Sequence, residues 1–452
     1  MNIIIAGGGK VGQTLVRQLS AEGHDLTMID RDKHVLEKTV DRYDAMVVAG
    51  NCASKEVLLS AGIQDADLLI AATAMDEVNL LCCMTAHGLN KNLHTIARIR
   101  TPEYADQIMT MRDIFPLSMT VNPEMQAALE IERLLKFPGF LRRESFANDQ
   151  AQIVELRIDG TSRLCNLSLS ELGTVVKCRV LVCAVLRAGQ AVAPTGNFVL
   201  KEGDRIFVTA PTANLAILLK SLGIVTRKVR DVLICGGGRV SYYLASFLED
   251  ENMSVRILEK DHSRCVSLAS QFEYATVIHG DCSSQAMLDS QGLENMDAVV
   301  TLTGMDETNM VVSLYAGSRG VGQIITKLGR TENSKLADTM ALGSTISPKE
   351  LCCNSIIRYV RAMENQTGAA VSLHTIADDQ VEAVEFLVDQ STKHCGQPLK
   401  ELKLRQNVLI ASITHGADTQ IPNGNSCFYP GDSVVVVTAG RGILQGINDI
   451  FA

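Results

Sequence analysis

Hydrophobic residues in the first part of the chain fall in short runs that alternate with amphipathic stretches. The runs have the length of buried strands, and the stretches between them carry apolar residues at helical spacing. Such alternation predicts an α/β fold, a Rossmann-like doubly wound parallel sheet with helices on both faces. The runs are NIIIAG from Asn2, DLTMID from Asp25, AMVVAG from Ala45, LLIAAT from Leu68 and HTIARI from His94.

The pattern changes after the parallel part. Short β-branched runs separated by Gly, Pro and Asp turns predict a small α+β domain, too small to be the substrate-binding half of a typical dehydrogenase. The clearest runs are VELRID from Val154, RIFVTA from Arg205, VEFLVD from Val384 and SVVVVTAG from Ser433.

The whole two-part arrangement occurs twice. Residues 50–100 align with 280–330 at 14 identities in 51 positions, and the glycine-rich segments at Gly7 and Gly236 lie 229 residues apart. A long period shared by unlike segments indicates tandem duplication of one module. We predict N1 (1–123), a linker with a crossover helix (124–149), C1 (150–225), N2 (229–348), a second crossover segment (349–372) and C2 (373–452).

A helical stripe follows each parallel part. In the first, Ala128, Leu129, Ile131, Leu134 and Leu135 lie on one face, and Pro138-Gly139 ends the pattern. The stripe SPKELCCNSIIRYVRAMEN follows N2. Periodicity alone leaves two alternatives open: the helix covers its own sheet, or it crosses to another module. In the second case the stripe would serve for self-association.

Composition narrows the class of protein. The net charge of −9 argues against a nucleic-acid partner, and no apolar run is long enough to span a membrane. The N-terminus has no basic region of the kind that opens a signal peptide. Thirteen cysteines without a C-x-x-C pair predict buried, reduced thiols rather than a metal site. We therefore expect a cytoplasmic protein without a metal centre.

The first glycine segment has the context of a dinucleotide site. Gly7-x-Gly9-x-x-Gly12 follows a predicted strand, opens a predicted helix, and is followed by Asp30 at the end of the next strand. The helix N-terminus offers free N–H groups to phosphates, and Asp30 can accept hydrogen bonds from ribose hydroxyls. A carboxylate there disfavours a 2′-phosphate, which favours NAD or another adenine nucleotide over NADP; the adjacent Arg31 weakens that exclusion slightly.

The second segment departs from this pattern. Gly236-x-Gly238-x-x-Ser241 replaces the third glycine by serine, and Glu259 stands where N1 has Asp30. The serine side chain should push the helix slightly off the sheet. Binding at N2 is expected, with an empty or altered site as the open alternative.

Further candidates lie at the carboxyl ends of later strands, close to where a nucleotide would rest. Arginines there suit phosphates or a partner's carboxylates, although ordinary solvated surface charge explains each of them taken singly. The candidate cofactor-binding residues are, in N1, Gly7, Gly8, Gly9, Lys10, Val11, Gly12, Asp30, Arg31, Asn51, Cys52, Thr73, Ala74, Arg98 and Arg100, and in N2, Gly236, Gly237, Gly238, Arg239, Val240, Glu259, Asp281, Cys282, Thr303, Gly304, Lys327 and Arg330.

Catalytic residues do not repeat with the glycine segments. Neither copy places a His or a Cys–His pair at matching positions, and no Tyr-x-x-x-Lys pair occurs. The MDEVN and MDETN segments do recur, but acidic residues that open a helix first of all favour its N-terminus. The pattern favours nucleotide sensing without catalysis, with an NAD-dependent oxidoreductase as the alternative.

These motifs together resemble the TrkA family, the regulatory subunits of Trk potassium-uptake systems, which consist of two tandem RCK (regulator of potassium conductance) modules. The resemblance rests on MNIIIAGGGKVGQTL, MID, GN, ATAMDEVN, ARIR and a terminal GD…VVVV element, with counterparts in both copies. It covers the full length.

The resemblance implies that NAD(H), with ATP or ADP as further ligands, binds at the glycine segments without being consumed. It also implies self-association into a gating ring, typically of four chains, that docks on the cytoplasmic face of a potassium-translocating membrane subunit. The family's site maps to Gly7 to Val11, Asp30, Thr73, Ala74 and Arg98 in N1. In N2 it maps to Gly236 to Val240, Glu259, Thr303 and Gly304, and less securely to Lys327 or Arg330.

Overall fold

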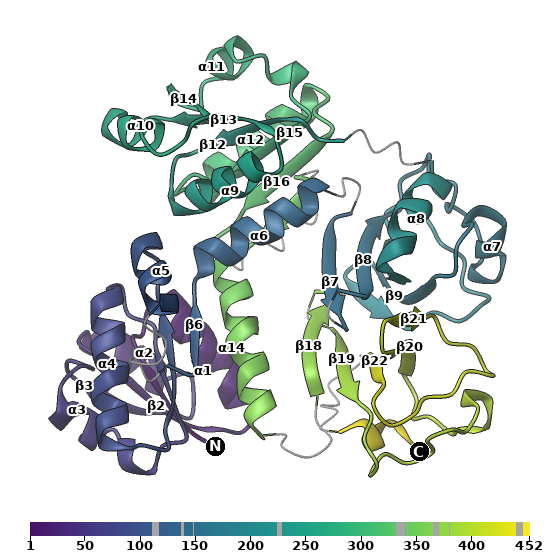
Figure 1. The fold of residues 1–452 in the computed structure, drawn as a ribbon. Helices are drawn as coiled ribbons and strands as arrows, with labels where there is room; N and C mark the ends of the chain where they lie inside the picture. The colour runs from purple at the N-terminus through teal and green to yellow at the C-terminus, as the bar shows by residue number, and fades with distance from the viewer. Residues whose placement is uncertain are drawn as a thin grey trace.

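The computed structural model describes residues 1–110, 117–136, 140–147, 149–223, 228–330, 340, 342–364, 370–378, 380–439 and 446–452. These residues form two parallel and two antiparallel sheets, in the order that the repeat predicts (Figure 1). Within these ranges, no helix combines the length and the hydrophobicity that a membrane crossing requires.

N1 contains a six-stranded parallel sheet in the order β3-β2-β1-β4-β5-β6, the doubly wound arrangement. The five predicted strands are confirmed, whereas the three-residue strand β6 was too short to show a pattern. The elements are β1 (Asn2–Ala6), α1 (Lys10–Ala21), β2 (Asp25–Asp30), α2 (Lys33–Val40), β3 (Met46–Ala49), α3 (Lys55–Ser60), β4 (Leu68–Ala71), α4 (Asp76–Leu89), β5 (His94–Arg98), α5 (Pro102–Thr110) and β6 (Met119–Val121).

N2 repeats this sheet in the order β14-β13-β12-β15-β16-β17. Its elements are β12 (Asp231–Cys235), α9 (Arg239–Asp250), β13 (Ser254–Glu259), α10 (His262–Ala269), β14 (Thr276–His279), α11 (Gln285–Ser290), β15 (Ala298–Thr301), α12 (Asp306–Ser318), β16 (Gln323–Lys327) and β17 (Ser344–Ile346). The two sheets therefore have one topology, as expected of a duplicated module.

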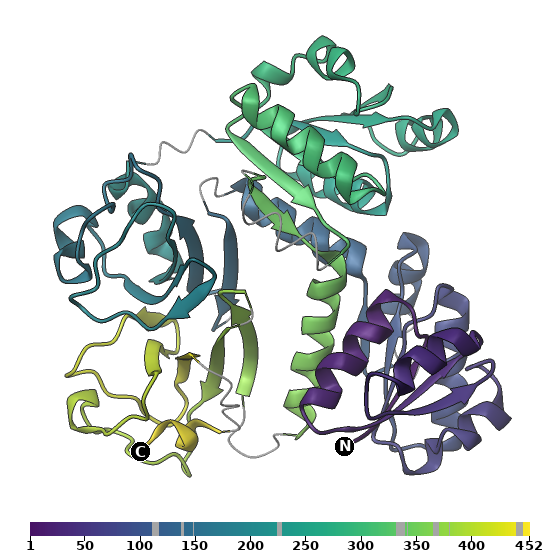
Figure 2. The same cartoon turned by 180° about the vertical axis from the view of Figure 1, so that it is seen from behind.

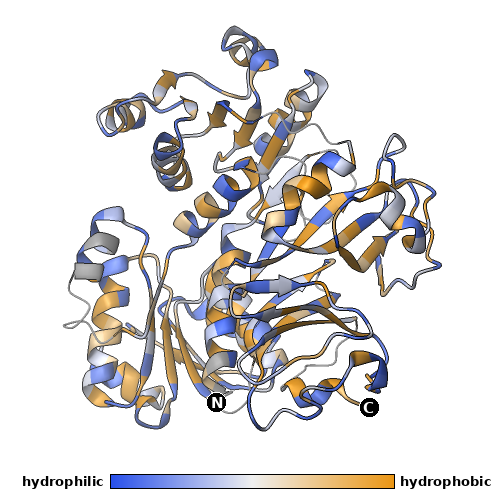
Figure 3. Ribbon diagram, turned by 45° about the vertical axis from the view of Figure 1, so that its right-hand side comes forward, coloured by the Kyte–Doolittle hydropathy of each residue, from blue (hydrophilic) through white to orange (hydrophobic). Residues whose placement is uncertain are grey.

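Each parallel sheet is hydrophobic on both faces, because helices cover both. In β1, Ile3 and Ile5 enter one core, and Ile4 and Ala6 enter the core on the opposite face. The strands accordingly consist largely of hydrophobic residues (Figure 3). This pattern explains why the strand runs in the sequence are continuous rather than alternating.

C1 and C2 each contain a five-stranded antiparallel sheet, and the two sheets pack face to face through one shared core. That core includes Phe146 and Phe207 from C1 and Val381 and Val435 from C2. The elements of C1 are β7 (Arg142–Phe146), β8 (Ala151–Arg157), α7 (Leu172–Val175), β9 (Leu181–Arg187), β10 (Gln190–Val192), β11 (Arg205–Pro211) and α8 (Leu215–Ser221), and those of C2 are β18 (Ala370–Ile376), β19 (Val381–Leu387), β20 (Val408–His415), β21 (Asp418–Gln420) and β22 (Ser433–Ala439).

The helix after N1, α6 (Pro123–Lys136), crosses to N2. Its buried residues Ala127, Ala128, Ile131, Leu134 and Leu135 share one hydrophobic core with strands and helices of N2. Figure 1 shows α6 lying beneath the N2 sheet, beside α9. A buried hydrogen bond fixes the contact, because Gln323 Nε2 on β16 donates to the backbone oxygen of Leu134 at 2.8 Å.

The helix after N2, α14 (Pro348–Glu364), makes the reverse crossing to N1. Cys352, Cys353, Ile356, Ile357 and Val360 enter the core between α1 and the N1 sheet. Figure 2 shows α14 running alongside the first helices of the chain.

An ion pair secures the far end of α14. Arg361 Nη2 lies 2.5 Å from Glu22 Oε1, directly after α1. Each parallel domain is therefore closed by the helix that follows the other one.

The crossing settles the alternative that periodicity left open, and it corrects one expectation. Because the α6 stripe is buried within its own chain, it is not a surface for self-association. Pro138 and Gly139, which the sequence gives as the end of this helix, lie outside the described residues. The exact domain boundaries stay predictions.

The reciprocal crossing predicts that a core mutation in one crossover helix destabilises the other domain. Ile131→Ala should cost about 2–5 kcal/mol, the usual range for such a cavity. Hydrogen exchange should then accelerate in β12 and β13 more than in β1 and β2. Ile356→Ala is the matched variant and should give the opposite pattern. If each variant accelerated exchange equally in both sheets, the conclusion that α6 stabilises N2 and α14 stabilises N1 would be contradicted.

Candidate functional site

The first glycine loop joins β1 to α1 in a conformation that requires glycine. Gly7 has φ +106°, and a Cβ on Gly12 would lie only 1.9 Å from the backbone oxygen of Gly7. Gly9 caps α1, so the first N–H groups of the helix point out at the carboxyl edge of the sheet. The loop therefore presents backbone donors to an anion, as the sequence predicts.

Asp30 holds this loop in place. Its Oδ2 accepts a hydrogen bond from the amide of Gly8 at 2.6 Å, and its Oδ1 accepts one from the amide of Asp32 at 2.9 Å. A carboxylate has about four lone-pair positions, so two of them stay open to ribose hydroxyls. Asp30 is thus both the support of the loop and a candidate ligand contact.

The second loop keeps this arrangement with different residues. Gly236 has φ +104°, and Glu259 accepts hydrogen bonds from the amides of Gly237 at 2.6 Å and Asp261 at 2.8 Å. The hydroxyl of Ser241 donates to the backbone oxygen of Gly236 at 2.5 Å. In the first loop a Cβ at the equivalent position, Gly12, would clash with the backbone oxygen of Gly7. The hydrogen bond from Ser241 to Gly236 offsets part of the free energy that is lost by placing a side chain at this crowded position.

An asparagine that sequence reasoning did not select connects the next two strand ends. Asn79 Oδ1 accepts hydrogen bonds from the amide and hydroxyl of Thr73, at 2.8 and 2.7 Å, and its Nδ2 donates to Arg98 O at 2.8 Å. Asn309 does the same for Thr303 and Lys327 in N2. The signal was present in the sequence, because this asparagine closes the recurring MDEVN and MDETN segments.

Asp76 fixes the loop that carries the arginines. Its Oδ2 accepts hydrogen bonds from the amides of Arg100 and Thr101, both at 2.9 Å. Burial acts to raise the pKa of this carboxyl, but these hydrogen bonds and the Arg100 charge outweigh it and hold the pKa below its usual value. The acidic residue therefore does more than favour a helix N-terminus.

The matching contacts in N2 settle which residues correspond. Asp306 accepts hydrogen bonds from the amides of Gly329 at 2.8 Å and Arg330 at 3.0 Å. Lys327 thus stands in the place of Arg98, and Gly329 in the place of Arg100. Arg330 comes one residue later, is exposed, and pairs with Glu307 at 3.0 Å. The second copy therefore has no cation at the position of Arg100.

Arg98 has the most unusual surroundings of these cations. Its side chain is 17% exposed, its nearest carboxylate is Glu124 at 3.9 Å, and its buried Nε has no partner among the described residues. Burial, followed by the charge of Arg100, lowers the pKa of Arg98. A buried, weakly paired guanidinium is suited to an incoming phosphate.

Arg100 and Lys327 are more fully occupied. The guanidinium of Arg100 contacts Asp76 and the backbone oxygen of Ala74. Lys327 Nζ donates to Leu302 O at 2.9 Å, and burial lowers its pKa.

The remaining candidates divide into two groups. Val11, Cys52, Val240 and Cys282 are buried, so they shape the site rather than line it. The exposed candidates at the carboxyl edge are Gly9, Lys10, Arg31, Asn51, Ala74, Gly238, Arg239, Asp281 and Gly304. The assignment of all these residues to a ligand stays a prediction.

The two sites approach each other across the crossover helices. The hydroxyl of Tyr243, on the helix after the N2 glycine loop, donates to Arg100 O of N1 at 3.0 Å and accepts from Asn122 Nδ2 at 2.9 Å. The charge of Glu124 acts on both Arg98 and Lys327, and that of Lys10 also reaches Lys327. A ligand at one edge is therefore within electrostatic reach of the other.

The fold and the glycine loops define a protein with two Rossmann-type nucleotide-binding folds, each followed by a small antiparallel domain. Residues 3–114 and 232–348 match the TrkA-N domain, and residues 153–223 and 383–445 match the TrkA-C domain. The chain belongs to the TrkA family.

Curated relatives match along their whole length. The Trk system potassium uptake protein TrkA homolog 1 of Methanosarcina mazei is 31% identical over 96% of this chain and 97% of its own. The Trk system potassium uptake protein TrkA of Vibrio alginolyticus is 28% identical over 100% of this chain and 98% of its own. The two-module architecture is thus shared with proteins of potassium uptake.

Solved structures support the RCK-type fold. The GsuK RCK domain aligns with a TM-score of 0.61 and 17% identity over 97% of this chain and 92% of that one. The GsuK channel bound to NAD aligns with a TM-score of 0.61 and 18% identity over 97% of this chain and 76% of the channel chain. At this identity the likeness concerns the fold alone.

The geometry predicts that Asp30→Ala weakens NAD(H) binding at N1 by about 1.5–3 kcal/mol, the range for a hydrogen bond to a charged group. Titration calorimetry on the full chain measures it. Asp32→Ala is the matched control, because Asp32 caps α2 through the amide of His34. Thermal melting of both variants separates lost ligand contact from a loosened loop. If a folded Asp30→Ala variant bound NAD(H) with unchanged affinity, the assignment of Asp30 as a ligand contact would be wrong.

Proposed function

We propose that this chain is the cytosolic, nucleotide-sensing regulatory subunit of a potassium transport system, peripheral to the membrane through a Trk-type potassium-translocating partner. The observation that carries the proposal is the link between the two glycine-loop sites through Tyr243 and the Arg100 loop. The potassium-uptake names of the relatives support the transported ion. A regulatory subunit needs sites whose occupation changes how its modules pack.

NAD(H) is the ligand that we propose for N1, with ATP or ADP as further ligands at the same loop. The glycine cradle, the free helix N-terminus and the open lone pairs of Asp30 fit the pyrophosphate and ribose of such nucleotides. The NAD-bound GsuK channel supports the choice. N2 offers the same cradle with Glu259 as its carboxylate.

The nucleotide acts in this proposal by differential affinity and is not consumed. A ligand shifts a two-state assembly only as far as it binds one state more tightly. A ratio of about 100 between states corresponds to roughly 2.7 kcal/mol per site, so several sites together suffice to switch a ring. The oxidoreductase alternative would instead give steady oxidation of NADH by the purified chain with a small oxidised substrate.

Self-association into a gating ring, with four chains as the expected number, requires a surface other than the crossover helices. Helices α4 and α12 offer one, because each helix, together with the methionine directly before it, exposes three apolar residues at the same module positions, 230 residues apart. The helix α4 faces the viewer in Figure 1 and α12 in Figure 2, so a chain has one such face on each side. The residues are Met75, Leu81, Met84, Met305, Val311 and Leu314.

We expect polar substitutions on these faces to reduce the assembly without unfolding the chain. Leu81→Ser together with Val311→Ser should lower the mass seen by light scattering, because each residue is more than half exposed and only association would bury it. Val266→Ser, an exposed apolar residue of α10, is the control. A wild-type monomer at micromolar concentration would contradict the ring itself.

Arg98 is our choice for the group that distinguishes nucleotides by phosphate number. Arg98→Gln should blunt the difference between ATP and ADP, or NADH and NAD, in potassium flux through the reconstituted transporter. Substituting Arg98 and Arg100 together should blunt it at least as much. Arg319→Gln removes an exposed arginine paired with Asp289 and serves as control. If the double variant still distinguished the nucleotides as well as wild type does, the two arginines would not be the sensing groups. If no nucleotide changed the flux with the wild-type protein, the regulatory proposal would be refuted.

A further inference from the structure

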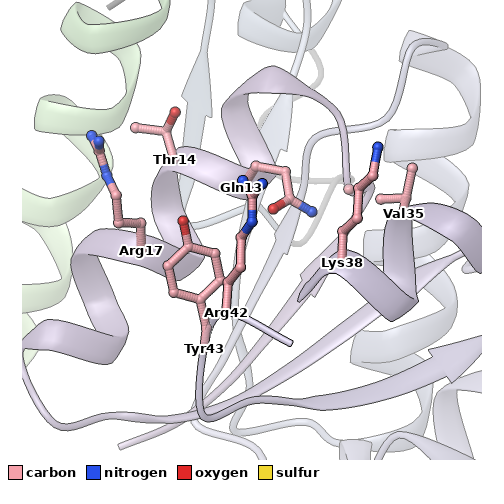
Figure 4. Close-up of a pocket in the computed structure, with 8 residues that line it drawn as sticks. Gln13, Thr14, Arg17, Val35, Lys38, Arg42 and Tyr43 are labelled. Atoms are coloured by element: carbon pink, nitrogen blue, oxygen red, sulfur yellow. The ribbon is translucent and has the colours of Figure 1, made fainter. Parts of the chain in front are cut away.

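N1 carries a small basic pocket on its side, in the groove between α1 and α2. The pocket has a volume of about 270 Å³ and runs along the two helices away from the carboxyl edge of the sheet. Figure 4 shows the lining side chains of α1, of α2 and of the segment that follows α2. Only Gly8 is shared with the nucleotide site. The lining residues are Gly8, Gln13, Thr14, Arg17, Val35, Lys38, Arg42 and Tyr43.

Three cations line this pocket and no carboxylate does. The side chains of Arg17, Lys38 and Arg42 form no ion pair or hydrogen bond with any described residue. The three side chains are exposed, and the carboxylates of Asp41 and Asp44 next to Arg42 in the sequence are not part of the pocket lining. An anion in the pocket would therefore meet cations and no carboxylate in the wall.

N2 has lost the same pocket, although its fold is the same. Ser246, Ser267 and Gln271 stand 229 residues after the three cations, so none of these three positions carries a charge. Tyr242 and Phe272, the counterparts of Gln13 and Tyr43, pack together with ring centroids 5.6 Å apart.

The glycine-loop end of this groove stays open in N2 but is lined differently. A hollow of about 480 Å³ there has two carboxylates, Glu259 and Asp261, and a single cation, Arg264, in its wall. Arg264 replaces Val35 and reaches Gly237 O with its guanidinium at 2.7 Å. The helix pair therefore does not need the N1 residues for its packing, and among the described residues the pocket lined by three cations belongs to N1.

We propose that this pocket binds a small anion that carries two or more phosphate groups. Arginine forks pair with phosphate oxygens two at a time, and a lysine adds a compact point charge. The volume lies just below the range of drug-sized ligand sites, and the lining carries three cations, which suits a short polyphosphate. The same chemistry occurs on a phosphorylated lipid headgroup, which the experiment distinguishes. This site is separate from the nucleotide site and does not rest on the proposed function.

The test uses the full chain saturated with NAD, so that the glycine loops are occupied, and titrates it with inorganic tripolyphosphate by calorimetry. The combined variant Arg17→Gln, Lys38→Gln, Arg42→Gln should raise the Kd at least about tenfold, since each charged contact is worth roughly that factor or more. Its affinity for NAD should be unchanged. A control with Lys55, Lys91 and Lys201 each changed to Gln removes the same charge from exposed positions elsewhere.

Each outcome decides the proposal. Loss of tripolyphosphate binding in the pocket variant, with retention in the control, supports a free polyphosphate as ligand. Binding only to vesicles that contain a phosphorylated phosphatidylinositol in phosphatidylcholine, lost in the same variant, assigns the pocket to a lipid headgroup. Equal binding by wild type and the pocket variant, or equal loss in both variants, overturns the proposal, and melting curves confirm that all variants are folded.

Discussion

The reciprocal packing of α6 and α14 is the interaction on which the rest of the structure depends. Each helix closes the apolar face of the parallel sheet that belongs to the other half of the chain. The buried side chains of Ile131, Leu134 and Leu135, at about 1.5–3 kcal/mol each, together contribute an amount comparable with the net stability of an ordinary domain. Neither parallel domain is therefore complete without the other.

This constraint brings the two glycine loops into one unit. Because α9 packs against α6, Tyr243 reaches the loop that carries Arg100, and Glu124 comes to lie between cations of both domains. A change in the spacing of the two modules must alter these contacts. In the proposed function, a nucleotide at a loop acts on the relative position of the modules through these contacts.

The two copies of the module share the residues that hold the site loops in place by hydrogen bonds, and they differ at other positions of the sites. Both copies keep a carboxylate on the glycine loop, an asparagine between two strand ends, and an aspartate on the following loop. The third glycine, the second arginine and the cations between the first two helices differ. The shared residues satisfy backbone groups of the loops. Of the divergent positions, Arg17, Lys38 and Arg42 are exposed, whereas Gly12 and its counterpart Ser241 are buried.

The sequence by itself determined the parallel sheets, the small antiparallel domains, the duplication and the position of the glycine loops. Those features follow from local rules, namely continuous hydrophobic runs, turn residues and a fixed repeat. It did not determine that the apolar stripe of α6 packs against the sheet of N2. A helical stripe indicates that one face of the helix is buried, but it does not indicate which element covers that face. Nor did the sequence show that Lys327 rather than Arg330 replaces Arg98, because a one-residue shift in the loop is visible only through the hydrogen bonds of Asn309 and Asp306. Contacts between residues far apart in the chain decided both, and these exist only once the tertiary structure has formed.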